Sequence, residues 1–123
     1  MSTLKVNDII EATSGGGKIF PPRAWVNYQN SGTNAVVGSG AVSSVTDNAV
    51  GVFTVSFSNS WSSATYTMAG STNTSAGNAT AAMAFNASSG GNVYTTTSVG
   101  LAFEDVDAGY SDYVNNVVMF VGS

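Results

Sequence analysis

Residues 43–57 read SSVTDNAVGVFTVSF, and this stretch decides the fold class. Its last five residues, FTVSF, alternate apolar and hydroxyl side chains. Because successive side chains of a strand point to opposite faces, the alternation predicts a half-buried strand from Val50 to Phe57. The turn-forming pair Asp47-Asn48 precedes that strand, so we expect an Asp-Asn turn at its start.

The composition is typical of a chain built from strands and turns. Ser, Thr, Asn and Gly account for 57 of the 123 residues, charged residues make up only 8%, and Leu occurs only twice. Strong helix formers are therefore scarce, while β-branched, aromatic and turn-forming residues dominate. A chain of this length forms a single domain.

Similar short runs, separated by turn clusters, follow one another along the chain. In the first, Val26 and Tyr28 share one face and Trp25 lies on the other. The expected strands are residues 24–29, residues 35–46 as one bent strand or two short ones, and residues 50–57, 65–69, 82–86, 92–104 and 113–121. Together they predict an all-β fold, an antiparallel β-sandwich of about seven to eight short strands.

The N-terminal residues differ from the rest of the chain. Their apolar side chains are Leu4, Val6, Ile9 and Ile10. Three consecutive glycines at 15–17 and the pair Pro21-Pro22 then interrupt regular structure. We expect an N-terminal arm with a Gly/Pro hinge over residues 1–22 and a β-sandwich knob domain over residues 23–123. An ordered first strand of the same domain is the alternative.

The last predicted strand is apolar on both faces. Val114, Val118 and Phe120 share one face, and the other face carries Val117, Met119 and Val121. A strand of this kind is covered on both sides. Because a chain this small has one core, the second face predicts a subunit interface formed by Val117, Met119 and Val121.

Several classes of function are disfavoured by charge and residue type. The net charge is −4 with only three basic residues, so no basic patch is available for nucleic acid or for an anionic membrane. Cys and His are both absent, which removes thiolate metal sites and the commonest general base. We expect no enzymatic activity and no cofactor. The first ten residues also lack the apolar core of a signal peptide.

Two groups of side chains leave a binding role open. Glu104, Asp105 and Asp107, with Asp112 nearby, form either a calcium-binding loop or a solvated acidic loop over residues 104–112. The aromatic residues serve either the core or a platform on which sugars stack. These aromatic residues are Trp25, Trp61, Tyr66, Tyr94, Tyr110 and Tyr113.

Four segments together resemble a known family. Residues 23–33, RAWVNYQNSGT, resemble the (R/K)AWVNFNGTGT opening of a domain common in tail-fibre and virion structural proteins of marine bacteriophages. Residues 43–57 resemble the next block of that family. Residues 2–10, STLKVNDII, are similar to the LKVNTIQ-type N-termini of many phage fibre proteins, and residues 112–120, DYVNNVVMF, look like the closing strand.

The resemblance implies a trimeric virion protein at the particle surface, assembled in the host cytoplasm. The chain departs from fibre proteins in having a knob directly after a short arm, without a stalk. We therefore expect a non-enzymatic, fibre-like trimeric knob for host attachment, whose Ser, Thr and Asn loops contact bacterial surface glycans. The alternative is a capsid decoration protein (head knob) docked on other virion proteins, of capsid or tail, through its arm. An enzyme acting on host polysaccharide is a third hypothesis.

Overall fold

The computed structural model describes residues 2–3, 9–10, 18–19, 22–73, 81–85, 94–105 and 109–122. Within these residues the chain forms strands and turns and no helix, which confirms the predicted all-β class. The strands are β1 (Ile9–Ile10), β2 (Lys18–Ile19), β3 (Pro22–Gln29), β4 (Ala35–Gly40), β5 (Val42–Ala49), β6 (Val52–Phe57), β7 (Thr67–Asn73), β8 (Ala81–Phe85), β9 (Ser98–Asp105), β10 (Gly109–Tyr110) and β11 (Asn115–Val121).

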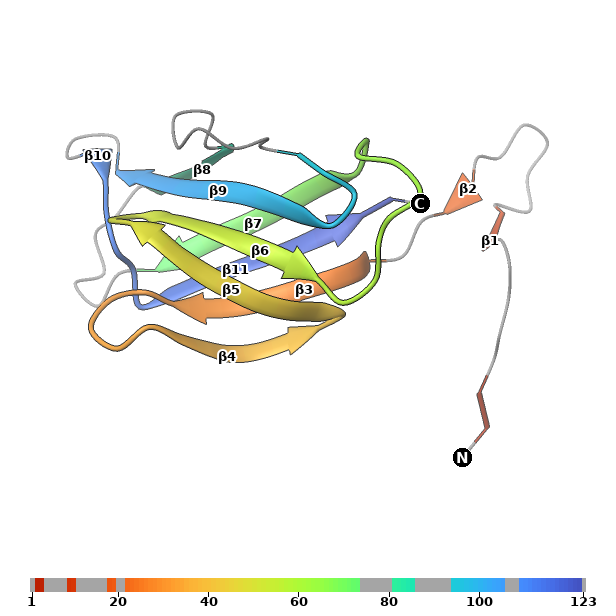
Figure 1. Ribbon diagram of the computed structural model, residues 1–123, viewed down its shortest axis with the longest axis horizontal. Helices are drawn as coiled ribbons and strands as arrows, with labels where there is room; N and C mark the ends of the chain where they lie inside the picture. The colour runs from red at the N-terminus through yellow and green to blue at the C-terminus, as the bar shows by residue number, and fades with distance from the viewer. Residues whose placement is uncertain are drawn as a thin grey trace.

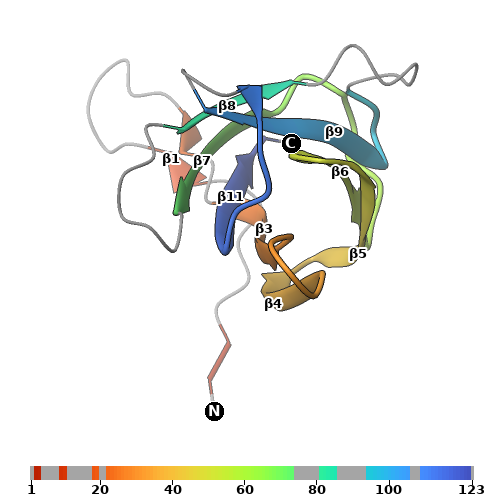
Figure 2. The same cartoon turned by 90° about the vertical axis from the view of Figure 1, so that its left-hand side faces the viewer.

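Two antiparallel sheets form the layers of a sandwich (Figure 1). The five-stranded sheet has the order β10-β9-β6-β5, with β8 also paired to β9, and the four-stranded sheet has the order β4-β3-β11-β7. Within the described residues, strands β1 and β2 pair only with each other. The end view in Figure 2 shows the two layers joined along one side, where β4 runs into β5.

The corner between β4 and β5 answers a question that the sequence left open. Residues 35–46 form two strands and not one bent strand, and the single residue Ala41 separates them. Ala41 adopts a left-handed φ of 55°, and its carbonyl accepts a hydrogen bond from the Ser58 N–H at 3.0 Å. A non-glycine residue with positive φ is uncommon, so this residue marks the place where the chain leaves one sheet for the other.

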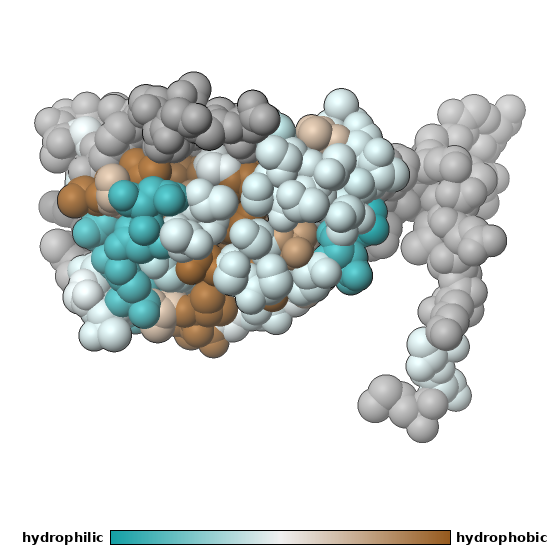
Figure 3. Space-filling model, viewed as in Figure 1, coloured by the Kyte–Doolittle hydropathy of each residue, from teal (hydrophilic) through white to brown (hydrophobic). Residues whose placement is uncertain are grey.

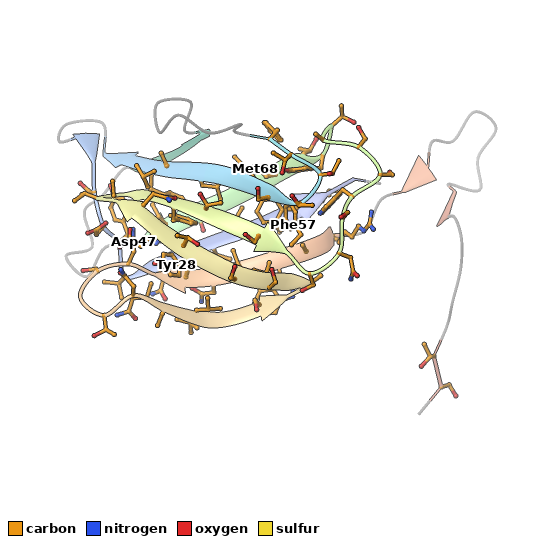
Figure 4. All side chains as sticks on the ribbon, in the orientation of Figure 1. Tyr28, Asp47, Phe57 and Met68 are labelled. Atoms are coloured by element: carbon orange, nitrogen blue, oxygen red, sulfur yellow. The ribbon has the colours of Figure 1, made fainter. Side chains whose placement is uncertain are left out.

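The core lies between the sheets and follows the predicted alternation. In β6 the side chains of Phe53, Val55 and Phe57 are buried, whereas the intervening hydroxyl residues are half-buried; Val52, at the start of the strand, is buried as well. Aromatic rings gather in two groups along the core. One group contains Tyr28, Phe53, Phe103 and Tyr113, and the other contains Phe57, Trp61, Tyr66, Tyr94 and Phe120. Figure 4 labels Tyr28 in the first group and Phe57 in the second, further along the sandwich.

A buried polar pair, Asn30 and Asn116, fixes one end of the four-stranded sheet. The Asn116 amide donates to the Tyr28 carbonyl at 3.0 Å and to Asn30 Oδ1 at 2.8 Å, and it accepts from the Thr72 hydroxyl at 2.8 Å. Asn30 Oδ1 also accepts from the backbone N–H of Tyr113 at 3.0 Å. Because buried polar groups are costly unless paired, these bonds hold β3, β7 and β11 in one register.

The Asp-Asn turn expected before β6 is wrong. Asp47 and Asn48 belong to β5, and the turn lies at Val50-Gly51. Gly51 has a φ of 67°, and a Cβ there would lie 2.6 Å from the Ser111 nitrogen and 2.8 Å from the Phe103 carbonyl oxygen. Only glycine meets both conditions, so backbone packing places the turn three residues after the predicted site.

The continuous strand predicted over residues 92–104 is also wrong, because β9 begins only at Ser98. The Thr95 hydroxyl accepts hydrogen bonds from the backbone N–H groups of Thr97 at 3.1 Å and Ser98 at 2.8 Å. A threonine side chain that captures nearby backbone donors competes with the strand pairing. The chain therefore reverses at residues 95–98 and does not extend through them.

Candidate interaction surface

The outward side of the four-stranded sheet carries large apolar side chains. Trp25 of β3 lies opposite Met119 of β11, and Asn27 lies opposite Val117. Trp25 is 45% exposed, Met119 44% and Val117 40%. We term this surface the Trp25 face. It comprises Trp25 and Asn27 of β3, Val117 and Met119 of β11, Gly38 and Gly40 of β4, and Ala69 and Ser71 of β7.

The Trp25 ring lies across strand β4, over two glycines. A Cβ on Gly40 would lie 2.4 Å from the indole Nε1, and one on Gly38 would lie 3.2 Å from Cη2. Real Cβ atoms do not approach other atoms as closely as the first of these distances. Gly38 and Gly40 therefore lie within a strand, where they make room for the indole.

Asn27 leaves a polar atom unpaired on this face. Its Oδ1 is buried and has no hydrogen-bond partner within the described part of the chain, although the residue as a whole is only partly buried. An unpaired buried acceptor costs about 1–3 kcal/mol. The Trp25 face thus holds an unsatisfied acceptor among its apolar side chains.

Exposed apolar residues concentrate on this sheet. Among the described residues, the exposed large hydrophobic side chains are Trp25, Val36, Val37, Val50, Val117 and Met119, and all of them except Val50 lie on β3, β4 or β11. Single exposed apolar residues are ordinary on protein surfaces, but a contiguous patch marks a site of interaction. The register of β3 and β11 makes this patch contiguous.

The outward side of the five-stranded sheet has the opposite character. Hydroxyl residues occupy five of its outward positions, which we term the hydroxyl face: Ser44 and Thr46 of β5, Thr54 and Ser56 of β6, and Ser98 of β9. The Thr54 hydroxyl donates to Asn48 Oδ1 at 2.8 Å. This sheet faces the viewer in Figure 1, and pale, weakly polar side chains cover much of it in Figure 3.

The residues predicted for the subunit interface are partly brought together. Val117 and Met119 lie on the Trp25 face, whereas Val121 is half-buried beside Thr67 and Pro22. The sequence placed Trp25 on the opposite face of its strand from Val26 and Tyr28 but did not place it beside Met119. The two-sided apolar pattern of residues 113–121 is the signal that could have suggested such a neighbour.

The predicted docking arm lies mostly outside the described residues. Leu4 and Val6 are among the residues that are not described. Ile9 and Ile10 form β1, which pairs with Lys18 and Ile19 of β2. The structure describes the backbone pairing of this arm but not the side chains of Ile9 and Ile10.

Most of the described aromatic residues belong to the core and not to a sugar-binding platform. Trp61, Tyr66 and Tyr113 are buried, and Tyr94 packs against them while half-buried. The Tyr66 hydroxyl donates to the carbonyl oxygens of Thr95 at 3.1 Å and Ser98 at 3.2 Å. Burial raises the pKa of Tyr66 to about 12. Of the predicted platform residues, Tyr110 has no described side chain and Trp25 is exposed.

The acidic segment is described only in part. Asp107 lies outside the described residues, and Glu104 and Asp105 contribute backbone pairing between β9 and β10. Asp112 Oδ1 accepts hydrogen bonds from the Asn30 amide at 3.1 Å and from the Gly51 N–H at 2.7 Å. Asp112 therefore supports the turn before β6, and calcium binding by residues 104–112 stays a prediction.

The two faces of the described sandwich suit different contacts. The Trp25 face has apolar side chains that a partner can bury, and the hydroxyl face has groups that can form hydrogen bonds. The described residues contain no group of three or more acidic side chains that could hold a metal ion. They also contain no helix that is long and apolar enough to cross a membrane. No family model, curated protein or solved structure matches this chain.

Proposed function

We propose that this chain is a non-enzymatic surface protein of a bacteriophage virion, a fibre-like trimeric knob for host attachment. The observation that carries the proposal is the contrast between the Trp25 face and the hydroxyl face. An apolar face on a domain otherwise covered by hydroxyl and amide groups suits a subunit that assembles and presents a polar surface. The resemblance of residues 23–33 and 43–57 to phage virion proteins supports that setting.

In this proposal the protein assembles in the host cytoplasm and needs no cofactor, nucleic acid or membrane. Its polar side contacts glycans on the bacterial surface. Serine, threonine and asparagine side chains make adaptable hydrogen bonds and lose little side-chain entropy on binding. The hydroxyl face and the turn around Asn34, whose amide donates to Asp47, provide groups of this kind.

Binding of the purified protein to host cells tests the attachment role. We expect the labelled protein to bind cells of the bacterium on which the phage grows, and an excess of unlabelled protein to delay phage adsorption. Purified surface polysaccharide should compete with this binding. Binding to phage particles but not to cells would contradict the attachment role.

The second candidate is a capsid decoration protein held through its arm. The observation that favours it is the pairing of β1 with β2 alone, outside both sheets of the sandwich. A separate element before the knob is available to dock on capsid or tail proteins. Deletion of residues 2–14 should then abolish binding to particles that lack this protein, while circular dichroism shows that the knob still folds. If the truncated protein still docks, the arm has no such role.

A further inference from the structure

We infer that the Trp25 face packs against the same face of another copy of this chain. The inference deepens the proposed function, on which it rests, by naming the partner of that face. It is carried by three observations: the apolar patch, the distribution of charge, and the arrangement of large, small and amide side chains on the four strands.

The apolar patch has the composition of an interface centre. Trp25, Met119 and Val117 are neighbours across the β3–β11 pairing, and each exposes 40–45% of its surface. Tryptophan and methionine are enriched in protein interfaces, and tryptophan is among the commonest residues that dominate binding energy. A partner that covers this patch removes all three side chains from water at once.

The charge distribution favours a copy of the same chain over a charged partner. Arg23 is the only charged residue in β3, β4, β7 and β11, and its guanidinium lies 4.9 Å above the Trp61 ring. The outward positions of Trp25, Met119 and their cross-strand neighbours therefore carry no charge that could pair with a strongly charged partner. Two copies, each with a net charge of −4, bring no like charges together when they meet through this face.

The face is also complementary to itself in shape. The central strands β3 and β11 carry the large residues Trp25 and Met119, whereas β7 presents Ala69 and Ser71 at the outward positions. The large side chains of Trp25 and Met119 in one copy can therefore pack on the small side chains of Ala69 and Ser71 in the next. The same patch then serves both partners, as in symmetric assemblies.

Asn27 gives the contact a polar element. A primary amide carries both donors and an acceptor, so two copies of one asparagine can hydrogen-bond to each other. Because Oδ1 is buried within its own chain, its amide must rotate outward when the contact forms, and Asn27 of a neighbouring copy then provides the donor that Oδ1 lacks within the described chain. A single polar pair at the centre of an apolar interface fixes register.

Molar mass in solution, measured by light scattering on the full-length protein, is the first test. We expect an assembled species at micromolar concentration. Met119→Glu places a charge in the contact and should raise the concentration at which half of the chains are assembled by about a hundred-fold or more. Val50→Glu, at an exposed apolar position in the β5–β6 turn, is the matched control and should assemble as the wild type does. A monomeric wild type, or equal effects of both variants, would overturn the inference.

Cross-linking tests the face directly and does not depend on the folding of a charged variant. The chain has no cysteine, so Val117→Cys introduces a unique thiol on the Trp25 face. We expect a short bismaleimide to join two copies of this variant and to leave Thr54→Cys, on the hydroxyl face, uncoupled. An assembled Val117→Cys protein that does not cross-link, or one that cross-links only to a different virion protein, would overturn the inference.

These results are separable from the proposed function. Copies that join through the Trp25 face but are absent from virions would leave the inference standing and refute the virion role. Three chains joined through Val117→Cys would support both the inference and the proposed trimer, whereas two or four chains joined in this way would support the inference and contradict the trimer expected from the resemblance. A virion protein that stays monomeric would refute the inference alone.

Discussion

The Trp25 face and the hydroxyl face lie on opposite sides of one core, and both consist of strand residues that point away from it. On one side, Trp25, Val117 and Met119 interrupt a polar background. On the other, serine and threonine face each other at the outward positions in the middle of the β5–β6 pairing, and Ser98 of β9 lies beside them. Because charged residues make up only 8% of the chain, hydroxyl and amide groups provide most of the polar surface that contacts water. Where they give way to tryptophan, methionine and valine, the surface is suited to being covered.

The Trp25 face and the turn before β6 differ in what their glycines make room for. Gly40 makes room for a side chain, the Trp25 indole, which can move. Gly51 makes room for backbone atoms of Ser111 and Phe103, which cannot move without breaking the hydrogen bonds from the Phe103 N–H to Gly51 and from the Ser111 N–H to Phe103. The Trp25 face therefore depends on adjustable side-chain packing, whereas the turn before β6 depends on fixed backbone packing.

The largest expected effect follows from that difference. Gly51→Ala combines a positive φ with contacts below 3 Å to backbone atoms, and we expect it to lower the free energy of unfolding by about 3 kcal/mol or more. Gly32→Ala is the control, because Gly32 has a φ of 83° but no atom within 4 Å of the added Cβ. It should cost only about 1 kcal/mol. Urea denaturation measures both, and equal losses would show that φ alone sets the cost.

The second effect concerns the core that the two faces share. Burial raises the pKa of Tyr66 to about 12, while the unfolded chain ionises near the ordinary value of 10. Because the folded pKa is the higher one, this stabilisation is complete below pH 10 and is lost as the pH rises through 12. A shift of this size corresponds to roughly 2–3 kcal/mol.

Urea denaturation between pH 9 and pH 12 measures this loss. Tyr66→Phe removes the ionising group, so its stability should fall less over the same range. Burial also raises the pKa of Tyr28, with added repulsion from Asp47 and Asp112, and burial raises that of Tyr94. A smaller slope should therefore remain in the variant. Identical slopes for the two proteins would show that Tyr66 ionises as it does in the unfolded chain.

The third effect concerns the packing of the Trp25 ring on Gly38 and Gly40. Gly40→Ala puts a methyl group where the indole lies, and we expect the ring to swing off β4 at a cost of about 1 kcal/mol in folding stability. The chain has two tryptophans, so a Trp61→Phe background leaves Trp25 as the only source of tryptophan fluorescence. In that background Gly40→Ala should increase the quenching of fluorescence by acrylamide. Unchanged quenching would mean that the indole does not rest on Gly40.

Local alternation predicted a good part of the fold. Residues 53–57 and 24–29 have the buried and outward faces that their patterns indicated. The two missed turns have local physical causes that a hydropathy pattern does not encode. Gly51 is required by backbone atoms from residues far along the chain, and Thr95 captures backbone donors with its own hydroxyl.

The candidate surface was harder to predict than the core. Val117 and Met119 could be assigned to an outward apolar face from their own strand alone. Trp25 joins them only because β3 pairs with β11, and strand order is a property of the whole chain. The position of the Trp25 indole across Gly38 and Gly40 depends in turn on the pairing of β3 with β4. Each additional residue of the Trp25 face could therefore be predicted only by knowing one more strand pairing, which the sequence pattern did not specify.

The smallest expected effect on folding comes from a pair of substitutions that compares the two faces most directly. Valine and threonine have nearly the same shape, and Thr54 and Val117 occupy outward positions on opposite sheets. Thr54→Val removes one exposed hydrogen bond to Asn48, and Val117→Thr adds one hydroxyl to the apolar patch. At partly exposed positions such changes alter folding stability by no more than about 0.5 kcal/mol.

Assembly should separate these two substitutions although folding does not. A hydroxyl buried in the contact without a partner weakens association, so Val117→Thr should raise the dissociation constant about ten-fold. Thr54→Val, outside the contact, should leave it unchanged. Sedimentation at several concentrations measures both. If the two variants associate equally well, the faces differ in composition but not in role, and the contact lies elsewhere on the molecule.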